Sequence, residues 1–312
     1  MLKSTKTLIV IVGPTAIGKT DLAVKLATHY QTDIVSADSR QFYKEMHIGT
    51  AKPFNEQLLA AHHHFINSHN IWDSFSVGEY EMQALEIINN LFKSKNIVVL
   101  VGGSGLYVQA ICQGFDMIPK AKEGIREKLN RLFADKGIEH LQKILKKEDP
   151  VYYSKVDLNN SQRIIRALEV WESTGKPFSF YRTQTQNKRP FNIIKIGLNV
   201  TRNELYQRIN KRVDLMMQNK FLEEVKSLLA YKHLNSLNTV GYSELFEFLE
   251  GQTKLEEAID KIKQNTRRFA KRQLTWFRKD TDIKWFEPWQ TNEILNYLNH
   301  LLLSPEPLEQ KN

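Results

Sequence analysis

Residues 7–20 read TLIVIVGPTAIGKT. The first six form an apolar, β-branched run that stops at Gly13, as expected of a strand buried in a parallel sheet. The following residues fit the spacing G-x-x-x-x-G-K-S/T, which binds phosphate groups when it lies between an apolar strand and a helix. We therefore predict a phosphate-binding loop made of Gly13, Pro14, Thr15, Ala16, Ile17, Gly18, Lys19 and Thr20.

The chemistry of this loop is that of an anion site. Glycines let the backbone curl so that successive N–H groups point at one anion, and the start of the following helix adds positive potential. Lys19 supplies a charge to a terminal phosphate, and the Thr20 hydroxyl can ligate Mg²⁺. The loop predicts a diphosphate or triphosphate site, but it does not name the reaction, because kinases, GTPases and some transferases share it.

Strand and helix patterns alternate along much of the chain. A helix is predicted over 19–29, and further buried strands over 33–36, 96–101 and 193–198. This alternation favours an α/β fold with a P-loop NTPase-like parallel sheet flanked by helices.

A second region has a different character. Residues 121–148 are rich in Lys, Glu, Leu and Ile, and both this stretch and residues 158–173 have helical patterns. We interpret them as a helical insertion domain at 119–189, within a core formed by 1–118 plus 190–312 that ends in further helices.

Composition narrows the class of protein. The 312 residues are 41% hydrophobic and 25% charged, which is typical of a globular chain, and the net charge of +9 fits either a solvated basic face or a polyanion partner. The single cysteine excludes a disulfide framework. Since no apolar run approaches the ~20 residues that span a bilayer, we expect a cytoplasmic protein without a membrane partner.

Two further groups of side chains call for interpretation. Asp38 follows the strand at 33–36, so it should lie near the bound phosphates as a general base or, alternatively, cap a helix or loop. The strand at 96–101 runs into Gly102-Gly103-Ser104-Gly105 without an acidic residue, which argues against ordinary ATP hydrolysis.

For His62-His63-His64 we expect a polar loop or a packing role rather than a metal site, since no carboxylate cluster is nearby in sequence.

With these residues the chain resembles the tRNA dimethylallyltransferases, also called tRNA isopentenyl transferases. Seven segments carry the resemblance in family order: GPTAIGKT from Gly13, DSRQFYKEMHIGTAKP from Asp38, GGSGLY from Gly102, QRIIRALE from Gln162, RINKRV from Arg208, VGY from Val240 and AKRQLTW from Ala270. A C-terminal zinc finger of the kind that eukaryotic members often carry is not possible with one cysteine, so the chain is similar to the bacterial type.

The resemblance implies a reaction. The dimethylallyl group of dimethylallyl diphosphate would move to N6 of the adenine at position 37, next to the anticodon, in tRNAs that read codons starting with U, and diphosphate would leave. The loop would then hold diphosphate and Mg²⁺ rather than ATP. Partners would be dimethylallyl diphosphate and the anticodon stem-loop of tRNA, and nothing in the sequence requires more than a monomer.

The resemblance also implies roles for individual residues. Asp38 would take the N6 proton, Arg212 would bind the diphosphate, and Ser104 would supply a hydroxyl where the family usually has threonine. The implied tRNA contacts are Asp38, Ser39, Arg40, Gln41, Ser104, Arg126, Gln162, Arg163, Ile164, Ile165, Arg166, Val240, Gly241 and Tyr242.

Two other readings remain open on the residues alone. A P-loop kinase for a small molecule or nucleotide would use ATP, with Asp38 activating a hydroxyl. A non-catalytic RNA-binding module would carry a vestigial loop, although the intact Lys19, Thr20 and Asp38 argue against it.

Overall fold

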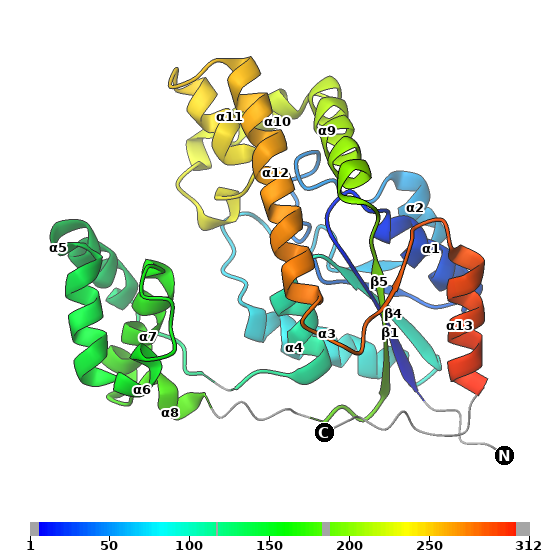
Figure 1. Ribbon diagram of the computed structural model, residues 1–312, viewed down its shortest axis with the longest axis horizontal. Coiled ribbons are helices and arrows are strands. Elements are labelled where there is room, and N and C mark those ends of the chain that lie inside the picture. Colours follow the sequence, from blue (N-terminus) through cyan, green and yellow to red (C-terminus); the bar gives the residue numbers. More distant parts are fainter. Residues whose placement is uncertain (1–5, 117, 183–187, 304–312) are drawn as a thin grey trace. The chain divides into compact units, whose positions relative to one another are not determined.

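A computed structural model describes residues 6–116, 118–182 and 188–303. The chain divides into two compact units, each described here by itself: an α/β unit of residues 1–112 and 189–312, and a helical unit of residues 113–188 (Figure 1). The helical unit begins a few residues before the position 119 expected from the sequence.

A parallel sheet forms the centre of the α/β unit. Its six strands lie in the order β3-β2-β4-β1-β5-β6, and every neighbouring pair is parallel. The predicted α/β fold is therefore confirmed, with two short edge strands that the sequence did not predict. The strands are β1 (Thr7–Val12), β2 (Ile34–Ser36), β3 (His63–His64), β4 (Ile97–Gly102), β5 (Asn192–Leu198) and β6 (Lys284–Phe286).

Helices cover both faces of this sheet because successive side chains of a strand point to opposite faces. Ile9 and Ile11 of β1 belong to the core shared with α1 (Lys19–His29) and α13 (Thr291–Leu303). Leu8 and Val10 belong to the core on the other face, which includes α3 (Val77–Leu91) and α4 (Gly105–Gln113) (Figure 1). Burial on both faces explains why β1 reads as one continuous apolar run.

The C-terminal helices of the α/β unit build a separate small core. Phe221, Tyr242 and Leu245 are buried there, together with Met46 from the loop after β2. This core fixes that loop against helices that come much later in the sequence. The remaining elements of the unit are α2 (Asn55–Ala60), α9 (Arg202–Gln218), α10 (Phe221–Ser227), the 3₁₀ turns η1 (Leu229–Tyr231) and η2 (Asn235–Leu237), α11 (Tyr242–Leu249) and α12 (Leu255–Phe277).

The helical unit is organised around two helices. Leu141 and Leu145 of α5 (Ile125–Glu148) pack with Ile164, Ile165 and Leu168 of α7 (Ser161–Thr174). The backbone of α5 is interrupted at Gly137, which has φ 74°. Two short helices, α6 (Pro150–Tyr153) and α8 (Phe178–Tyr181), complete the unit. Across the residues that the structure describes, in both units, none of the helices has the length and apolarity needed to cross a bilayer.

Candidate active site

Three loops meet where neighbouring parallel strands end. β1 leads into the phosphate loop, β4 ends at Gly102 before Ser104, and β2 leads to Asp38. β4 lies between β1 and β2 in the sheet, and Val12 pairs with Gly102. The carboxyl edge of a parallel sheet is where α/β proteins bind ligands, so the fold brings the predicted phosphate loop, Asp38 and Ser104 to one place.

The phosphate loop has the backbone of an anion site. Gly13 has φ 146° and Gly18 has φ 95°, values that side-chain-bearing residues rarely adopt. Gly18 is also the N-cap of α1, so the loop passes directly into the positive end of that helix. The Lys19 ammonium folds back over the loop and donates to the Pro14 carbonyl at 2.7 Å.

Two cations and one carboxylate come together at this loop. Burial lowers the pKa of Lys19 to about 8; nearby Asp38 opposes that shift and nearby Arg212 adds to it. Burial also lowers the pKa of Arg212, and Asp38 again acts in the opposite direction. Arg212 lies on α9 and donates to the Thr15 hydroxyl at 3.3 Å. The arrangement suits a multiply charged anion, because both cations are partly desolvated and the loop supplies further donors.

Ser104 links the loop after β4 to the loop after β2. Its hydroxyl accepts a hydrogen bond from the Ser39 amide at 3.1 Å and donates to the Ser39 hydroxyl at 3.2 Å. The side chain therefore contacts Ser39, the residue that follows Asp38 in the chain. Asp38 itself accepts from the Arg40 amide at 3.2 Å.

Gln273 of α12 is a site residue that sequence reasoning missed. Its amide oxygen accepts from the Thr15 amide of the phosphate loop at 2.8 Å, and its amide nitrogen donates to the Gly103 carbonyl at 2.9 Å. A single buried side chain thus joins two of the three loops. The AKRQLTW segment contained this glutamine, but no local pattern indicates which backbone groups it reaches.

Replacing Gln273 with leucine should destabilise the protein. The change leaves the Thr15 amide and the Gly103 carbonyl without their partner, and an unpaired buried polar group costs about 1–3 kcal/mol. We expect the free energy of unfolding to fall by about 2 kcal/mol in urea denaturation. The matched change at Gln264, which is exposed on the same helix, should stay within about 0.5 kcal/mol of the wild type. Equal effects at the two positions would contradict the bridging role.

Arg40 and Gln41 hold loops of the α/β unit in the structure. The Arg40 guanidinium donates to the carbonyls of Asn235, Ser236 and Asn238. The Gln41 amide donates to the carbonyls of Thr50 and Ala51. Their contact with RNA stays a prediction, and the observed contacts give both residues a positioning role.

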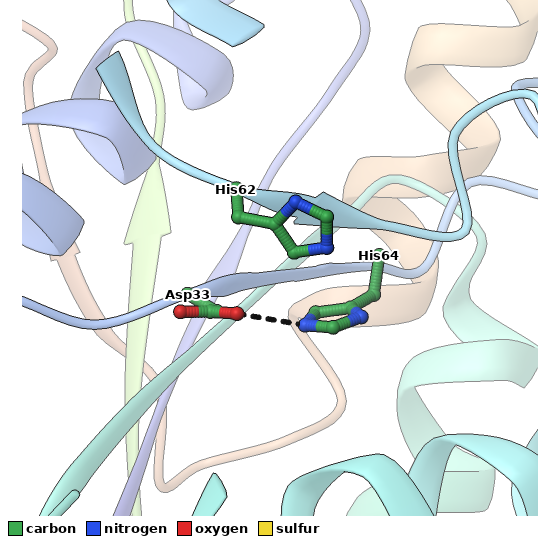
Figure 2. Close-up of side chains that lie close together, drawn as sticks. All are labelled: Asp33, His62 and His64. Carbon is green, nitrogen blue, oxygen red and sulfur yellow. Dashed lines mark hydrogen bonds and ion pairs between the residues drawn. The ribbon is translucent and has the colours of Figure 1, made fainter. Parts of the chain in front are cut away.

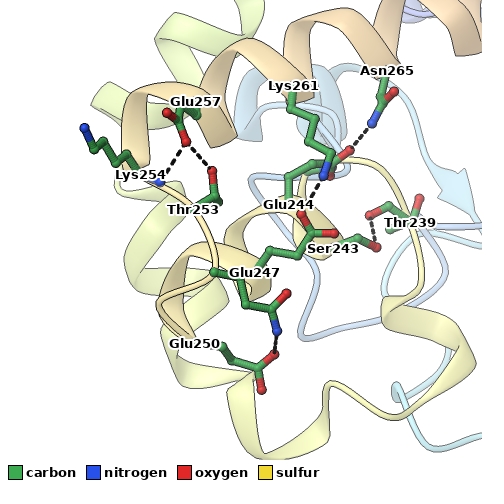
Figure 3. A network of polar contacts seen from close by, with 12 residues as sticks. Thr239, Ser243, Glu244, Glu247, Glu250, Thr253, Lys254, Glu257, Lys261 and Asn265 are labelled. Carbon is green, nitrogen blue, oxygen red and sulfur yellow. Dashed lines mark hydrogen bonds and ion pairs between the residues drawn. The ribbon is translucent and has the colours of Figure 1, made fainter.

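The segment at Val240, Gly241 and Tyr242 is anchored by α11 and α12. Buried Glu244 accepts from the Gly241 amide and from Asn265 of α12, both at 2.7 Å, and Lys261 pairs with Glu247 nearby (Figure 3). Tyr242 is fully buried and donates to Glu224 at 2.6 Å. Its side chain is therefore a core element that holds the segment in place, whereas Val240 is partly exposed; contact of this segment with RNA stays a prediction.

Glu224 is a second positioning residue that the sequence did not indicate. Its carboxylate accepts from the amides of His47, Ile48 and Gly49 at 2.6–3.1 Å. It also accepts the Tyr242 hydroxyl. One side chain of α10 thereby fixes the turn in the loop that follows Asp38.

In the helical unit, the predicted polar contacts gather around one acid. Arg126 donates to Gln162 at 3.1 Å, and both Arg126 and Arg166 pair with Glu169, which is 1% exposed. Arg163 is exposed next to this group. Ile164 and Ile165 are fully buried in the core of the unit, so their side chains do not belong to an exposed RNA-binding face.

The chain is similar to proteins of one known family. A family model described as IPP transferase matches residues 41–280. The tRNA dimethylallyltransferase of Christiangramia forsetii is 55% identical over 280 residues, 90% of this chain and 93% of that protein. The tRNA dimethylallyltransferase 1 of Bacteroides thetaiotaomicron is 50% identical over 292 residues, 94% of this chain and 95% of that protein.

Solved structures are similar over nearly the whole chain. The tRNA isopentenylpyrophosphate transferase from Bacillus halodurans has a TM-score of 0.72 and 36% identity, covering 98% of this chain and 100% of that one. A eukaryotic dimethylallyltransferase acting on tRNA has a TM-score of 0.80 and 25% identity, covering 98% of this chain and 82% of that one.

Proposed function

Since this chain belongs to the IPP transferase family, we propose that it is a prenyltransferase that moves a dimethylallyl group from dimethylallyl diphosphate to N6 of the tRNA adenine at position 37. The observation that carries the proposal is the meeting of Lys19, Arg212 and Asp38 at the phosphate loop. Two cations suit a diphosphate leaving group, and a carboxylate beside them suits the acceptance of a proton.

The diphosphate binds at the phosphate loop in this proposal. Loop amides and the start of α1 face the diphosphate oxygens, and Lys19 neutralises one of the two phosphate groups. Arg212 donates to the diphosphate through two guanidinium N–H groups. Negative charge grows on the diphosphate as the C1–O bond breaks, so these donors stabilise the transition state more than the ground state.

Thr20 is the residue that would hold Mg²⁺ next to this anion. Its hydroxyl oxygen is a hard ligand of the kind that Mg²⁺ takes together with phosphate oxygens and water, and it directly follows Lys19 at the start of α1. Bound Mg²⁺ would supply additional neutralisation of the diphosphate charge.

The acceptor is the exocyclic amine of adenine, a poor nucleophile because its lone pair is delocalised into the ring. In the proposed step N6 forms a bond to C1 of the prenyl group, the C1–O bond breaks, and diphosphate takes the bonding electrons. Asp38 accepts the proton that N6 loses. The Ser104 hydroxyl, held beside Ser39, orients the base next to this carboxylate.

The adenine must leave its stack to reach this site, as bases do in other base-modifying enzymes. We propose that the anticodon loop is held by the polar group of the helical unit, Arg126, Gln162, Arg163 and Arg166. We propose a monomer as the active unit. We propose that the reaction takes place in the cytoplasm.

Arg163→Ala should weaken RNA binding and leave the chemical step unchanged. We expect a Kd for an anticodon stem-loop about fivefold higher, as for the loss of ~1 kcal/mol of net hydrogen bonding, and a salt dependence whose slope falls by about one. Filter binding at several salt concentrations measures both. Arg131→Ala, an exposed arginine on α5 of the same unit, is the matched control and should bind like the wild type. The same Kd for Arg163→Ala and wild type would contradict the contact.

The pKa of Lys19 predicts how affinity for the prenyl donor varies with pH. The charged ammonium binds the diphosphate, so, once the diphosphate is fully ionised, affinity should begin to fall as the pH approaches about 8 and should fall by up to about tenfold per pH unit above it. Calorimetry with the unreactive thiolodiphosphate analogue measures this profile. Lys19→Arg keeps its charge throughout and should give a flat profile over the same range. A parallel fall in both proteins would contradict the assignment to Lys19.

The kinase reading is not favoured. The proteins reported above are named as transferases of prenyl groups to tRNA, and β4 ends in glycine where many NTPases carry an acid. Incubation with ATP and Mg²⁺ in the absence of RNA should therefore release no ADP above background. Steady ADP release at a rate comparable to prenyl transfer would instead support a kinase function.

A further inference from the structure

Asp33, His62 and His64 form a cluster on the edge of the sheet in the α/β unit (Figure 2). The edge strand β3 pairs with β2, matching Ile34 with His63 and Val35 with His64. Because strand side chains alternate, His62 and His64 share one side, while buried His63 points elsewhere and its Nδ1 bonds to the Ala61 carbonyl. Asp33 directly precedes β2 and lies against His64.

The three side chains bring one possible ligand atom each into a small space. His64 Nε2 lies 2.9 Å from an Asp33 carboxylate oxygen, and the rings of His62 and His64 meet edge to face with centroids 4.5 Å apart. One ligand atom from each residue lies within 4.8 Å of the others. Tetrahedral zinc with bonds of about 2.0–2.1 Å places its ligand atoms roughly 3.3 Å apart. Modest side-chain rotations would therefore bring the three ligand atoms to zinc-binding distances.

We propose that Asp33, His62 and His64 bind one Zn²⁺, with water as the fourth ligand. Two imidazoles and a carboxylate form a donor set suited to zinc, whereas Mg²⁺ prefers oxygen ligands alone. The side chains of His64 and Asp33 are 20% and 24% exposed and His62 is more exposed, so an ion can enter and a water can complete the coordination.

The position of the site indicates a structural role. β3 has only two residues, and its pairing with β2 is short. An ion held by His64 of β3, by His62 directly before β3 and by Asp33 directly before β2 would fix this edge strand to its neighbour. The cluster lies at the start of β2, whereas Asp38 follows its end, so the zinc site is separate from the proposed active site.

Zinc binding can be measured on the complete chain without tRNA or prenyl donor. After treatment with chelator and dialysis, titration with ZnCl₂ by calorimetry, together with elemental analysis, should give one zinc per chain. His62→Ala and Asp33→Asn should each raise the Kd at least about tenfold, the loss caused even by removing a group that only supports a ligand. His233→Ala, an exposed histidine elsewhere in the unit, is the matched control and should bind like the wild type.

A second readout separates coordination from altered folding. Co²⁺ in place of Zn²⁺ should give the intense visible absorption of a four- or five-coordinate ion in the wild type, and His62→Ala should lose it. His62 is exposed, so circular dichroism should show an unchanged fold in that variant. Zinc should also raise the melting temperature of the wild type and of His233→Ala, but not that of His62→Ala.

Unchanged zinc affinity in both His62→Ala and Asp33→Asn would overturn the proposal, as would a wild type that binds less than one zinc at saturation. Neither result depends on prenyl transfer, so these measurements test the zinc site independently of the proposed function.

Discussion

Asp38→Ala should lower the rate of prenyl transfer by about 10²- to 10⁴-fold, the range expected for the loss of a positioned general base. The carboxylate lies near Lys19 and Arg212 at the phosphate loop, so in the proposed complex it is next to the bond that would break. Without it, the proton of N6 has no acceptor within the site. RNA binding should be largely kept, because most predicted contacts with the anticodon loop lie elsewhere. Single-turnover rates and filter binding measure the two effects separately.

Asp38→Asn is the control variant that keeps the size and shape of the side chain. Its side-chain oxygen can still accept the hydrogen bond from the Arg40 amide, but it cannot take a proton at neutral pH. We expect a loss close to that of alanine if the role is proton transfer. Single-turnover rates of both variants equal to that of the wild type would remove the general-base role.

Arg212→Met should lower kcat by about 10²- to 10³-fold, the effect of removing one preorganised donor to a developing anion. The guanidinium reaches the phosphate loop through the Thr15 hydroxyl and is partly desolvated, so the proposed interaction with diphosphate would be strong. Methionine keeps much of the length of the side chain and removes the charge. Steady-state kinetics with varied dimethylallyl diphosphate should show the larger loss in kcat rather than in KM.

Arg202→Met provides the matched change on the same helix. Arg202 is exposed and stacks on Tyr206, away from the loop, so kcat and KM should remain those of the wild type. A loss confined to KM for Arg212→Met would show that the residue binds ground state and transition state equally, contrary to the role proposed for it.

The fold could be predicted wherever the sequence pattern is local. Strand β1, the phosphate loop and helix α1 follow from an apolar run, a glycine motif and helix periodicity, and α1 spans the predicted 19–29. The short strands β3 and β6 could not be predicted, because His63-His64 and Lys284-Trp285-Phe286 lack the β-branched residues that mark the equally short β2, Ile34–Ser36. They join the sheet only because neighbouring strands offer free edges.

The residues of the candidate site also differ in whether a local sequence pattern predicts them. Lys19, Thr20 and Asp38 follow strands, so the parallel sheet alone predicts that they meet. Gln273 and Glu224 reach the loops from helices more than a hundred residues away, and their partners are backbone groups that no motif reveals. Asp33 joins His62 and His64 only through the pairing of β2 with β3, so the local sequence predicts polar loop or packing residues at the histidines and gives no sign of the cluster.

The mass of the RNA after reaction tests the central claim most directly. The purified protein is incubated with Mg²⁺, an unmodified tRNA that carries three adenines across the 3′ boundary of the anticodon, and either dimethylallyl diphosphate or ATP. We predict a gain of one C₅H₈ unit on that tRNA with the prenyl donor and none with ATP. An unchanged RNA mass with the prenyl donor, accompanied by release of ADP from ATP, would contradict the account.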